Sequence, residues 1–270
     1  IDPYMRGRMN DSKSYAAPAK IGEPMTGETA GVVVESNSDL FNVGDKVCAH
    51  KGWQTYIRAK DTDVALLKVP ESDIGLSSFL GTLGMPGRTA YFGLNRVGKP
   101  KSGETLVVSA ASGAVGAVVG QLGKIYGCRV IGIAGGPEKC AFVKDVLQLD
   151  ECVDYKAGNL EEDLKNACPN GIDIYFENVG GSITEAVLTR MNINGRISLC
   201  GLISGYNAES VVPGPAWGNL LIKRIKLKGF IVFDYFKRYM EAYQDITQWL
   251  KDDKIKYKNH IIPGIENAVS

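Results

Sequence analysis

The sequence of 270 residues predicts an α/β protein, with a doubly wound parallel sheet and a smaller, mostly antiparallel β domain. Two observations support this prediction. After Gly103, apolar strand-like runs alternate with helical segments, which is typical of a parallel sheet with helices on both faces. Before Lys60, short strands alternate with turn residues, and no helical period of useful length is present. A chain of this length can form two medium-sized domains.

The elements can be placed from these patterns, with a change of character at the glycine-rich stretch 81–87 and a helix after it at 89–94. In the β domain, strands are expected at 29–35, 46–50 and 54–58. In the second part, strands are expected at 106–109, 129–133, 152–154, 172–176, 196–200 and 225–233, and helices at 113–126, 137–147, 160–167, 182–191, 216–221 and 235–250. One face of the last helix should be core, and it carries Tyr239, Met240, Tyr243, Ile246 and Leu250.

The composition excludes several classes of protein. Hydrophobic residues make up 44% of the chain and the net charge is +1, which argues for a large core and against nucleic-acid or membrane partners. No apolar run approaches the roughly 20 residues that a membrane-spanning helix needs. The six cysteines form no C-x-x-C pair, so we expect free thiols and a cytoplasmic protein. With only two histidines, we expect no metal site built from imidazoles.

The segment from Thr105 to Tyr126 reads as a strand, a turn of small residues and an apolar helix. This is the first half of a mononucleotide-binding unit. At Gly113 the backbone can approach a pyrophosphate, and at Gly116 the helix can pack tightly on the strand. The helix N-terminus, with Ala114 and Val115, offers free N–H groups to phosphates. Ala111 replaces the first glycine of the G-x-G-x-x-G pattern, so a simple buried strand–helix corner is the alternative interpretation.

Glycine and small polar residues also follow three other predicted strands, at 134–139, 177–181 and 200–206. Ligands of open α/β sheets bind beyond the carboxyl ends of the strands, so these coincident turns favour dinucleotide binding. The second strand ends Ala134-Gly135-Gly136, without the acid that usually holds a ribose 2′-hydroxyl. Lys139 can neutralise a 2′-phosphate and Tyr155 can donate a hydrogen bond to it, which indicates NADP(H). The alternative for Lys139 is an ordinary solvated helix residue.

Several motifs together resemble a known family: Asp2-Pro3-Tyr4-Met5-Arg6, Gly84-Met85-Pro86-Gly87, Ala110–Gly116, Phe176–Gly181 and Cys200–Ser204. They are similar to the leukotriene B4 dehydrogenase/prostaglandin reductase group of the zinc-free medium-chain dehydrogenases/reductases. That group includes bacterial curcumin reductases and plant 2-alkenal double-bond reductases. The resemblance implies a GroES-like catalytic domain at 1–83 and 259–270, truncated at both ends, and a Rossmann NADP-binding domain at 84–258.

The resemblance also implies roles for individual residues. Gly113 to Gly116 would hold the pyrophosphate, and Lys139 and Tyr155 the 2′-phosphate. Tyr206 matches a tyrosine that acts on the substrate carbonyl or enolate, and Tyr4 matches a substrate-facing aromatic residue. The ribose and nicotinamide would be lined by Asn178, by Cys200, Gly201, Ile203 and Ser204, and by Phe230 and Val232.

The hypothesis is therefore an NADPH-dependent reduction of the C=C bond of an α,β-unsaturated ketone or aldehyde. A neutral phenol such as Tyr206 can donate a hydrogen bond to the developing enolate, although a packing role is its alternative. Zinc is not expected, because Thr26-Gly27-Glu28 lacks the histidine of the zinc-dependent relatives. Three alternative functions remain: a quinone oxidoreductase, an enzyme that oxidises alcohols, and a non-catalytic NADP-binding redox sensor.

A homodimer is also possible from the sequence, because the run 225–233 can form an edge strand that pairs with a second copy.

Overall fold

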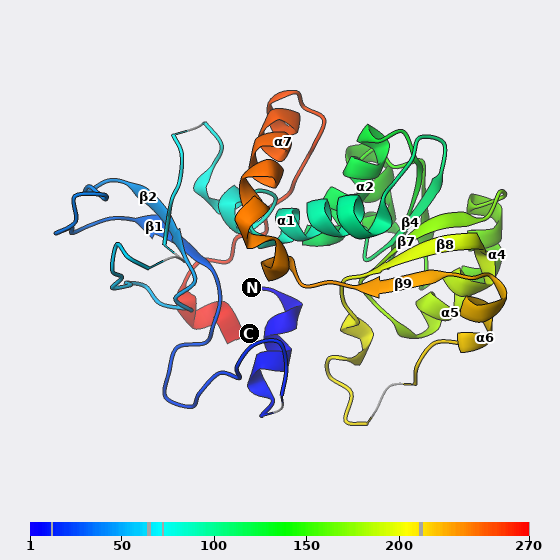
Figure 1. Cartoon of the computed structure of the whole chain (residues 1–270), viewed down its shortest axis with the longest axis horizontal. Helices are drawn as coiled ribbons and strands as arrows, with labels where there is room; N and C mark the ends of the chain where they lie inside the picture. The colour runs from blue at the N-terminus through cyan, green and yellow to red at the C-terminus, as the bar shows by residue number, and fades with distance from the viewer. Residues whose placement is uncertain (12, 64–65, 72, 211–212, 270) are drawn as a thin grey trace. The chain divides into compact units, whose positions relative to one another are not determined.

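The computed structural model describes residues 1–11, 13–63, 66–71, 73–210 and 213–269 (Figure 1). The chain divides into two compact units. The first unit consists of Ile1–Gly84 and Lys258–Ser270, and the second of Met85–Tyr257. None of the helices in the described ranges combines the length and the apolar character that crossing a membrane requires.

The first unit contains a three-stranded antiparallel sheet of β1 (Thr29–Val32), β2 (Lys46–Ala49) and β3 (Leu67–Lys68). This confirms the predicted antiparallel β domain. The strand expected at 54–58 is wrong, because the partner of β2 on that side is β3, which pairs Val47 with Lys68. Gln54 instead closes a local turn by donating to the Lys51 carbonyl at 2.7 Å. The remaining elements of this unit are the short 3₁₀ helices η1 (Pro3–Met9), η2 (Leu76–Leu80) and η7 (Ile265–Val269).

The second unit is built on a six-stranded, wholly parallel sheet with the strand order β6-β5-β4-β7-β8-β9. The prediction of a doubly wound α/β fold is thus confirmed. The strands are β4 (Thr105–Ser109), β5 (Arg129–Ala134), β6 (Glu151–Asp154), β7 (Ile172–Glu177), β8 (Met191–Leu199) and β9 (Lys226–Gly229). The α-helices are α1 (Met85–Phe92), α2 (Ala114–Ile125), α3 (Pro137–Ala141), α4 (Leu160–Ala167), α5 (Gly181–Arg190), α6 (Trp217–Ile222) and α7 (Tyr239–Lys251).

Helices cover both faces of this sheet, with α2 on one face and α4 and α5 on the other (Figure 1). All five residues of β4 are buried, as expected for a central parallel strand enclosed on both faces. Leu106 faces α2, where a side chain at Gly123 would collide with it. Its neighbour Val107 belongs to the core cluster on the α4 and α5 side, together with Leu164 and Tyr175. The alternation of side chains along β4 therefore supplies both halves of the core.

Several expected elements are shorter or differently wound. The helix expected at 137–147 is α3 followed by η4 (Phe142–Val146), which has wider turns that end with Leu147 N donating to Phe142 O at 3.1 Å. A further wide-turned segment, η3 (Gly93–Gly98), follows α1. A short 3₁₀ turn, η5 (Ile203–Gly205), follows β8. The strand expected at 225–233 stops at Gly229, and the 3₁₀ helix η6 (Val232–Arg238) then precedes α7.

Met240 was expected in the core and is 59% exposed, so that prediction is wrong. Ile246 was also expected in the core and is fully buried, which confirms that part of the prediction, and Ala242, which was not predicted, is fully buried as well. These two residues are four apart and share a face, whereas Met240 precedes Ala242 by two positions and points away from it. Tyr239 has a different environment, because the Arg88 guanidinium lies over its ring at 4.4 Å from the centroid.

Candidate functional site

The glycine-bearing turns that follow β4, β5, β7 and β8 lie at one edge of the sheet, because these strands are parallel and adjacent. Backbone hydrogen bonds join the turns. Ala111 N donates to Ile133 O at 3.0 Å, which ties the end of β4 to β5. Cys200 N donates to Glu177 O at 2.9 Å, which ties the end of β8 to β7. The structure therefore brings the four turns together at the carboxyl edge, where ligands of open α/β sheets bind.

The turn between β4 and α2 depends on the absence of a side chain at Gly116. A Cβ at Gly116 would overlap the Ala110 carbonyl oxygen and lie 3.0 Å from the Ala111 Cα. Ala110 itself has a left-handed backbone, with φ of 49°. The helix therefore starts in close contact with the strand end, as the sequence pattern of small residues predicts.

The N-terminus of α2 faces outward at this turn. Gly113 and Ala114 are exposed, and the first backbone hydrogen bond into the helix runs from Ala117 N to Gly113 O at 2.9 Å. The N–H groups of Ala114, Val115 and Gly116 therefore precede the helical ladder and carry the positive end of the helix dipole. An anion such as a pyrophosphate fits this arrangement.

The turn after β5 is held by a carboxylate from the next strand. Asp154 Oδ1 accepts hydrogen bonds from Gly136 N at 2.8 Å and from Lys156 N at 3.0 Å. These two backbone hydrogen bonds are the main reason that the pKa of Asp154 is lowered. The Asp154 carboxylate therefore holds the backbone of this turn. It does not take the role of the acid that usually binds a ribose 2′-hydroxyl at the end of the second strand.

Tyr155 and Lys156 lie over Gly135 at the end of β5. A Cβ at Gly135 would lie 2.7 Å from the Tyr155 ring and 3.0 Å from Lys156 Cε. Lys139 is exposed in the first turns of α3, which follows directly after Gly136. Two lysines and a phenol therefore flank this strand end. Lys156 was not predicted from the sequence, although its position immediately after Tyr155 was a usable signal.

A buried glutamate, Glu177, organises the turn after β7. Only 1% of Glu177 is exposed. Its Oε1 accepts from Ser109 Oγ at 3.0 Å, Val179 N at 2.6 Å and Gly180 N at 3.0 Å, and its Oε2 accepts from the Thr184 hydroxyl. The carboxylate thus joins the ends of β4 and β7 to the start of α5. This role of Glu177 was not predicted from the sequence, where the only signal was a lone acid at the end of an apolar strand.

Asn178 extends this network along the carboxyl edge. Its backbone N–H donates to Ser109 Oγ and its side-chain amide to Ser109 O, both at 2.8 Å. Its carbonyl accepts from Ile203 N at 3.1 Å, and Ser204 N and Oγ both donate to Val179 O, at 3.0 and 2.6 Å. Asn178, Ile203 and Ser204 therefore lie together at this edge of the sheet.

Tyr206 belongs to the same loop, and its hydroxyl lies against Gly201. A Cβ at Gly201 would come within 3.0 Å of the Tyr206 hydroxyl oxygen. Burial, and secondarily the Glu177 charge, raise the pKa of Cys200 to about 12. The Cys200 thiol therefore stays protonated at neutral pH, which fits a packing residue better than a nucleophile.

Phe230 and Val232 follow β9 and turn their side chains to the interior. The Phe230 ring is 6.3 Å from that of Phe176, edge to face, and it fills the space that a side chain at Gly93 would need. Val232 is 7% exposed. The Val232 side chain is therefore buried, whereas Phe230 stays partly exposed.

Tyr4 lies in the first unit, in η1, and Tyr206 in the second. Burial is the main cause that raises the pKa of Tyr4 to about 12, followed by the nearby Asp2 charge. The Arg8 guanidinium lies 5.5 Å from the centroid of the Tyr4 ring. The Tyr4 hydroxyl is consequently a hydrogen-bond donor throughout the neutral pH range.

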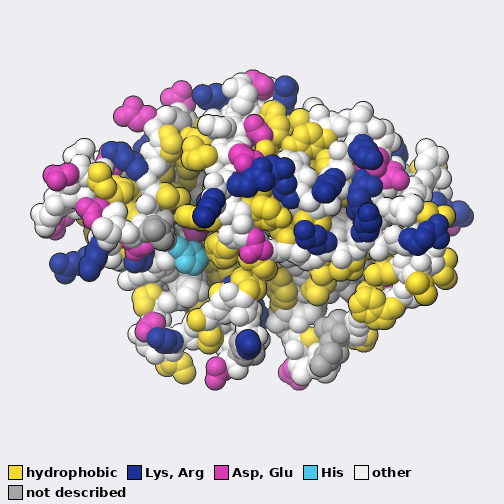
Figure 2. Space-filling model, in the orientation of Figure 1, with side chains coloured by type: hydrophobic (Ala, Val, Ile, Leu, Met, Phe, Trp, Pro, Cys, Tyr) yellow, Lys and Arg dark blue, Asp and Glu magenta, His cyan; other side chains and the backbone are white. Residues whose placement is uncertain are grey.

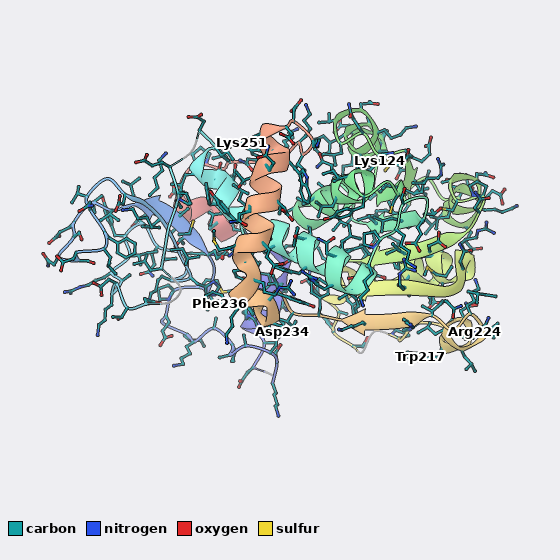
Figure 3. All side chains as sticks on the ribbon, turned by 45° about the horizontal axis from the view of Figure 1, so that its top comes forward. Lys124, Trp217, Arg224, Asp234, Phe236 and Lys251 are labelled. Carbon is teal, nitrogen blue, oxygen red and sulfur yellow. The ribbon has the colours of Figure 1, made fainter. Side chains whose placement is uncertain are left out.

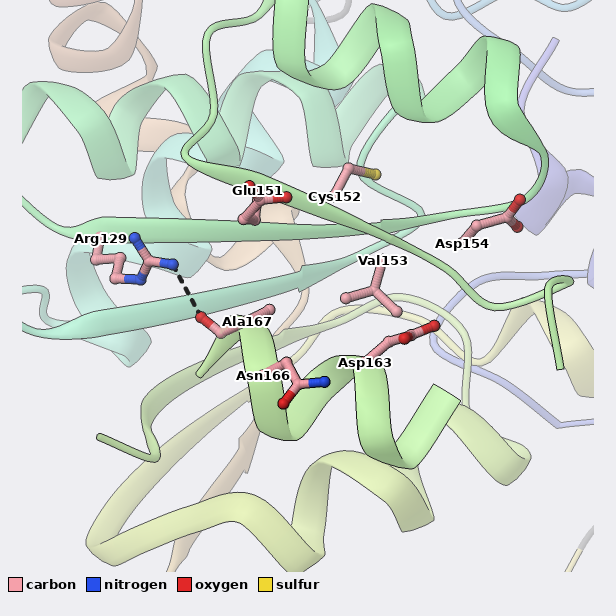
Figure 4. A pocket seen from close by; sticks show the side chains of 8 residues that line it. All are labelled: Arg129, Glu151, Cys152, Val153, Asp154, Asp163, Asn166 and Ala167. Atoms are coloured by element: carbon pink, nitrogen blue, oxygen red, sulfur yellow. Dashed lines mark hydrogen bonds between the residues drawn. The ribbon is translucent and has the colours of Figure 1, made fainter. Parts of the chain in front are cut away.

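A cavity of about 540 Å³ lies elsewhere in the second unit, between β6 and α4 (Figure 4). It is lined by Arg129, Glu151, Cys152, Val153, Asp154, Asp163, Asn166 and Ala167. The Arg129 guanidinium donates to the Ala167 carbonyl at 3.0 Å. The lining contains three carboxylates, from Glu151, Asp154 and Asp163, and one guanidinium, so an anionic phosphate does not suit the cavity.

Within the described ranges, no group of three or more His, Cys, Asp or Glu residues is placed to hold a metal ion.

Two family models match the chain. The model described as "N-terminal domain of oxidoreductase" matches residues 1–67, and the model described as "Zinc-binding dehydrogenase" matches residues 114–251.

Several relatives and solved structures are similar over 99% of this chain, among them the following three. The NADPH-dependent curcumin reductase of Escherichia coli is 50% identical, and the match covers 79% of that protein. The NADP⁺-dependent 2-alkenal reductase of Nicotiana tabacum is 44% identical, with 78% covered. The crystal structure of CurA from Vibrio vulnificus in complex with NADPH is 54% identical, with 81% covered and a TM-score of 0.93.

Proposed function

Because the chain belongs to the family of NADP-dependent oxidoreductases that contains curcumin reductase and 2-alkenal reductase, we propose that it reduces the C=C bond of α,β-unsaturated ketones and aldehydes with NADPH, without a metal ion. The observation that carries the proposal is the position of the Tyr206 hydroxyl. It lies against Gly201, in a loop that hydrogen bonds to the turn after β7 at the carboxyl edge of the sheet. A neutral donor at this edge suits a substrate whose oxygen becomes negatively charged.

The second unit offers candidate contacts for each part of NADPH. The pyrophosphate would lie at the N-terminus of α2, on the N–H groups of Ala114, Val115 and Gly116. Gly113 leaves the approach open, because it has no side chain and is exposed. Lys139, Tyr155 and Lys156 would hold the 2′-phosphate beyond β5. The loops that Glu177 organises would present Asn178, Gly201 and Ser204 to the ribose and nicotinamide.

Bound NADPH supplies the hydride that reduces the β-carbon of the substrate. The Tyr206 hydroxyl donates a hydrogen bond to the carbonyl oxygen, where negative charge develops in the transition state. Tyr206 or solvent then provides the proton that the α-carbon gains. In this proposal the first unit is the GroES-like catalytic domain, and Tyr4 is its candidate substrate-facing residue.

NADPH consumption by the purified chain, followed at 340 nm, tests the proposal. We expect turnover with a panel of enones and enals, and slower turnover with quinones. The metal content of the purified protein is measured in parallel, and activity should persist in a chelator. A strong preference for quinones, or stoichiometric zinc required for turnover, would contradict the proposal.

The first prediction concerns the 2′-phosphate. Replacing Lys139 or Lys156 with alanine should weaken NADPH binding about tenfold each, because each change removes a cation from the phosphate. NADH binding should be unchanged. Dissociation constants from cofactor fluorescence check this, with Lys165→Ala as the control, because Lys165 is exposed on α4 and pairs with Glu162. Equal losses for NADPH and NADH would indicate a structural effect.

We also propose a homodimer through β9, which ends the parallel sheet. All four residues of β9 are exposed, and so are Trp217, Leu221 and Ile222 of the neighbouring α6. Figure 2 shows hydrophobic side chains gathered over β9 and α6, and Figure 3 places Trp217 and Arg224 at this end of the unit. An identical strand, related by a two-fold axis, would satisfy the open backbone edge and cover this apolar surface at once.

The double change Leu221→Lys and Ile222→Lys should convert the dimer to a monomer, because it places two charges in the proposed contact. Sedimentation velocity measures the outcome. Val146→Lys is the matched control, because Val146 is 44% exposed in η4, outside this surface. A monomeric unmodified chain at micromolar concentration would exclude the dimer.

A further inference from the structure

Two cysteines, Cys140 in α3 and Cys152 in β6, lie on facing surfaces beside the turn after β5. Both are partly exposed free thiols. In the register of the sheet Cys152 pairs with Gly132, so the two residues share one face of the sheet. A Cβ at Gly132 would meet the Val143 side chain at 2.8 Å. That face is therefore covered by the helical segment that contains Val143.

Cys140 precedes Val143 by three residues in this segment, so both side chains point to the same side. α3 also packs directly on β6. Figure 4 shows Cys152 and Val153 on opposite sides of β6, with Val153 directed toward the helix that carries Asp163 and Asn166. The Cys152 thiol therefore points to the α3 side of the sheet, toward Cys140.

The two thiols are in hydrogen-bonding contact. Burial is the largest cause that raises the pKa of Cys152, and the hydrogen bond to Cys140 adds to it. The other cysteines have different surroundings. Cys168 is fully buried, Cys128 hydrogen bonds to the Lys101 carbonyl, Cys200 follows β8, and Cys48 belongs to the first unit.

We propose that Cys140 and Cys152 are a reversible disulfide site, which peroxides oxidise and thiols reduce. The thiol of one cysteine gives up its proton, its sulfur attacks a peroxide oxygen, and the O–O bond breaks. With hydrogen peroxide, a sulfenic acid forms, and the departing hydroxide takes up that proton and leaves as water. The thiol of the other cysteine then gives up its proton and its sulfur attacks the sulfenic acid sulfur, so that an S–S bond forms and the S–O bond breaks, and the departing hydroxide takes up this proton as a second water. Two electrons pass from the two thiols to the peroxide.

The disulfide lies between the groups that we propose for the 2′-phosphate, so its consequence rests on the proposed function. Cys140 directly follows Lys139, and Cys152 precedes Tyr155 by three residues. A disulfide would fix Cys140 of α3 to Cys152 of β6 and so restrict the segment that carries Lys139. We therefore expect oxidation to weaken NADPH binding and thereby to couple reductase activity to peroxide.

Peptide mapping tests the disulfide independently of cofactor binding. The full chain is treated with hydrogen peroxide, its free thiols are blocked with iodoacetamide, and trypsin is added. Cleavage after Lys139, Lys144 and Lys156 separates the two cysteines onto different peptides. We expect a linked pair of these peptides that disappears after treatment with dithiothreitol. If the two peptides stay unlinked while other thiols are oxidised, the site does not exist.

NADPH binding tests the consequence. Oxidation should raise the dissociation constant about tenfold in the unmodified chain and in the control Cys48→Ser, and dithiothreitol should restore it. Cys140→Ser and Cys152→Ser should lose this response. A linked pair without a change in NADPH affinity, or an equal response in Cys140→Ser, would overturn the coupling. Failure of the reduced chain to bind NADPH would instead contradict the proposed function, and the peptide result would still stand.

Discussion

Replacing Glu177 with alanine should destabilise the second unit by at least about 3 kcal/mol, because it leaves several buried donors without their acceptor. The carboxylate accepts from two backbone N–H groups, at Val179 and Gly180, and from the hydroxyls of Ser109 and Thr184. Its exposure of 1% leaves little room for water to replace it. Urea unfolding followed by circular dichroism measures the loss in the free energy of unfolding.

Glu177→Gln is the matched variant for this prediction. The amide oxygen keeps the acceptor for the two backbone groups, and the Thr184 hydroxyl can rotate to accept from the new amide donor. We expect this variant to unfold within about 1 kcal/mol of the unmodified chain. Glu162→Ala, on the exposed side of α4, should be neutral. If the alanine variant unfolds like the unmodified chain, Glu177 does not organise the turn after β7.

Replacing Tyr206 with phenylalanine should lower kcat for enones about a hundredfold and change the NADPH dissociation constant little. The ring and its packing against the loop remain, and only the hydroxyl that would stabilise the enolate oxygen is lost. Initial rates across the enone panel, together with cofactor titration, check the prediction. Tyr56→Phe is the control, because Tyr56 is 78% exposed in the first unit.

The same experiment separates the remaining alternatives. If Tyr206→Phe binds NADPH and leaves every enone rate unchanged, Tyr206 is a packing residue and a non-catalytic role for the chain gains support. A loss in kcat that is restricted to quinones would favour the quinone reductase.

Tyr4→Phe should mainly raise KM, because a substrate contact outside the reacting atoms contributes to binding of the ground state and transition state alike.

Local patterns determined the fold class and the position of the candidate site. A central parallel strand is buried on both faces, so β4 is a continuous apolar run that can be recognised without knowing its neighbours. The turns after β4, β5, β7 and β8 could be assigned to one edge because all parallel strands end there. Gly113, Gly116 and Lys139 were proposed in this way, whereas Tyr206 and Tyr4 came from the family resemblance.

The tertiary structure decided which side chains meet across the sheet. Ser109 and Glu177 are 68 residues apart and hydrogen bond because β4 and β7 are adjacent, a pairing that has no local signal. The same reason applies to Cys140 and Cys152, which meet because the fold packs α3 on β6. Gln54 and its neighbours form no strand because β3 occupies the position beside β2. Periodicity describes one segment at a time, while hydrogen-bond partners and strand pairing depend on segments that the fold brings together.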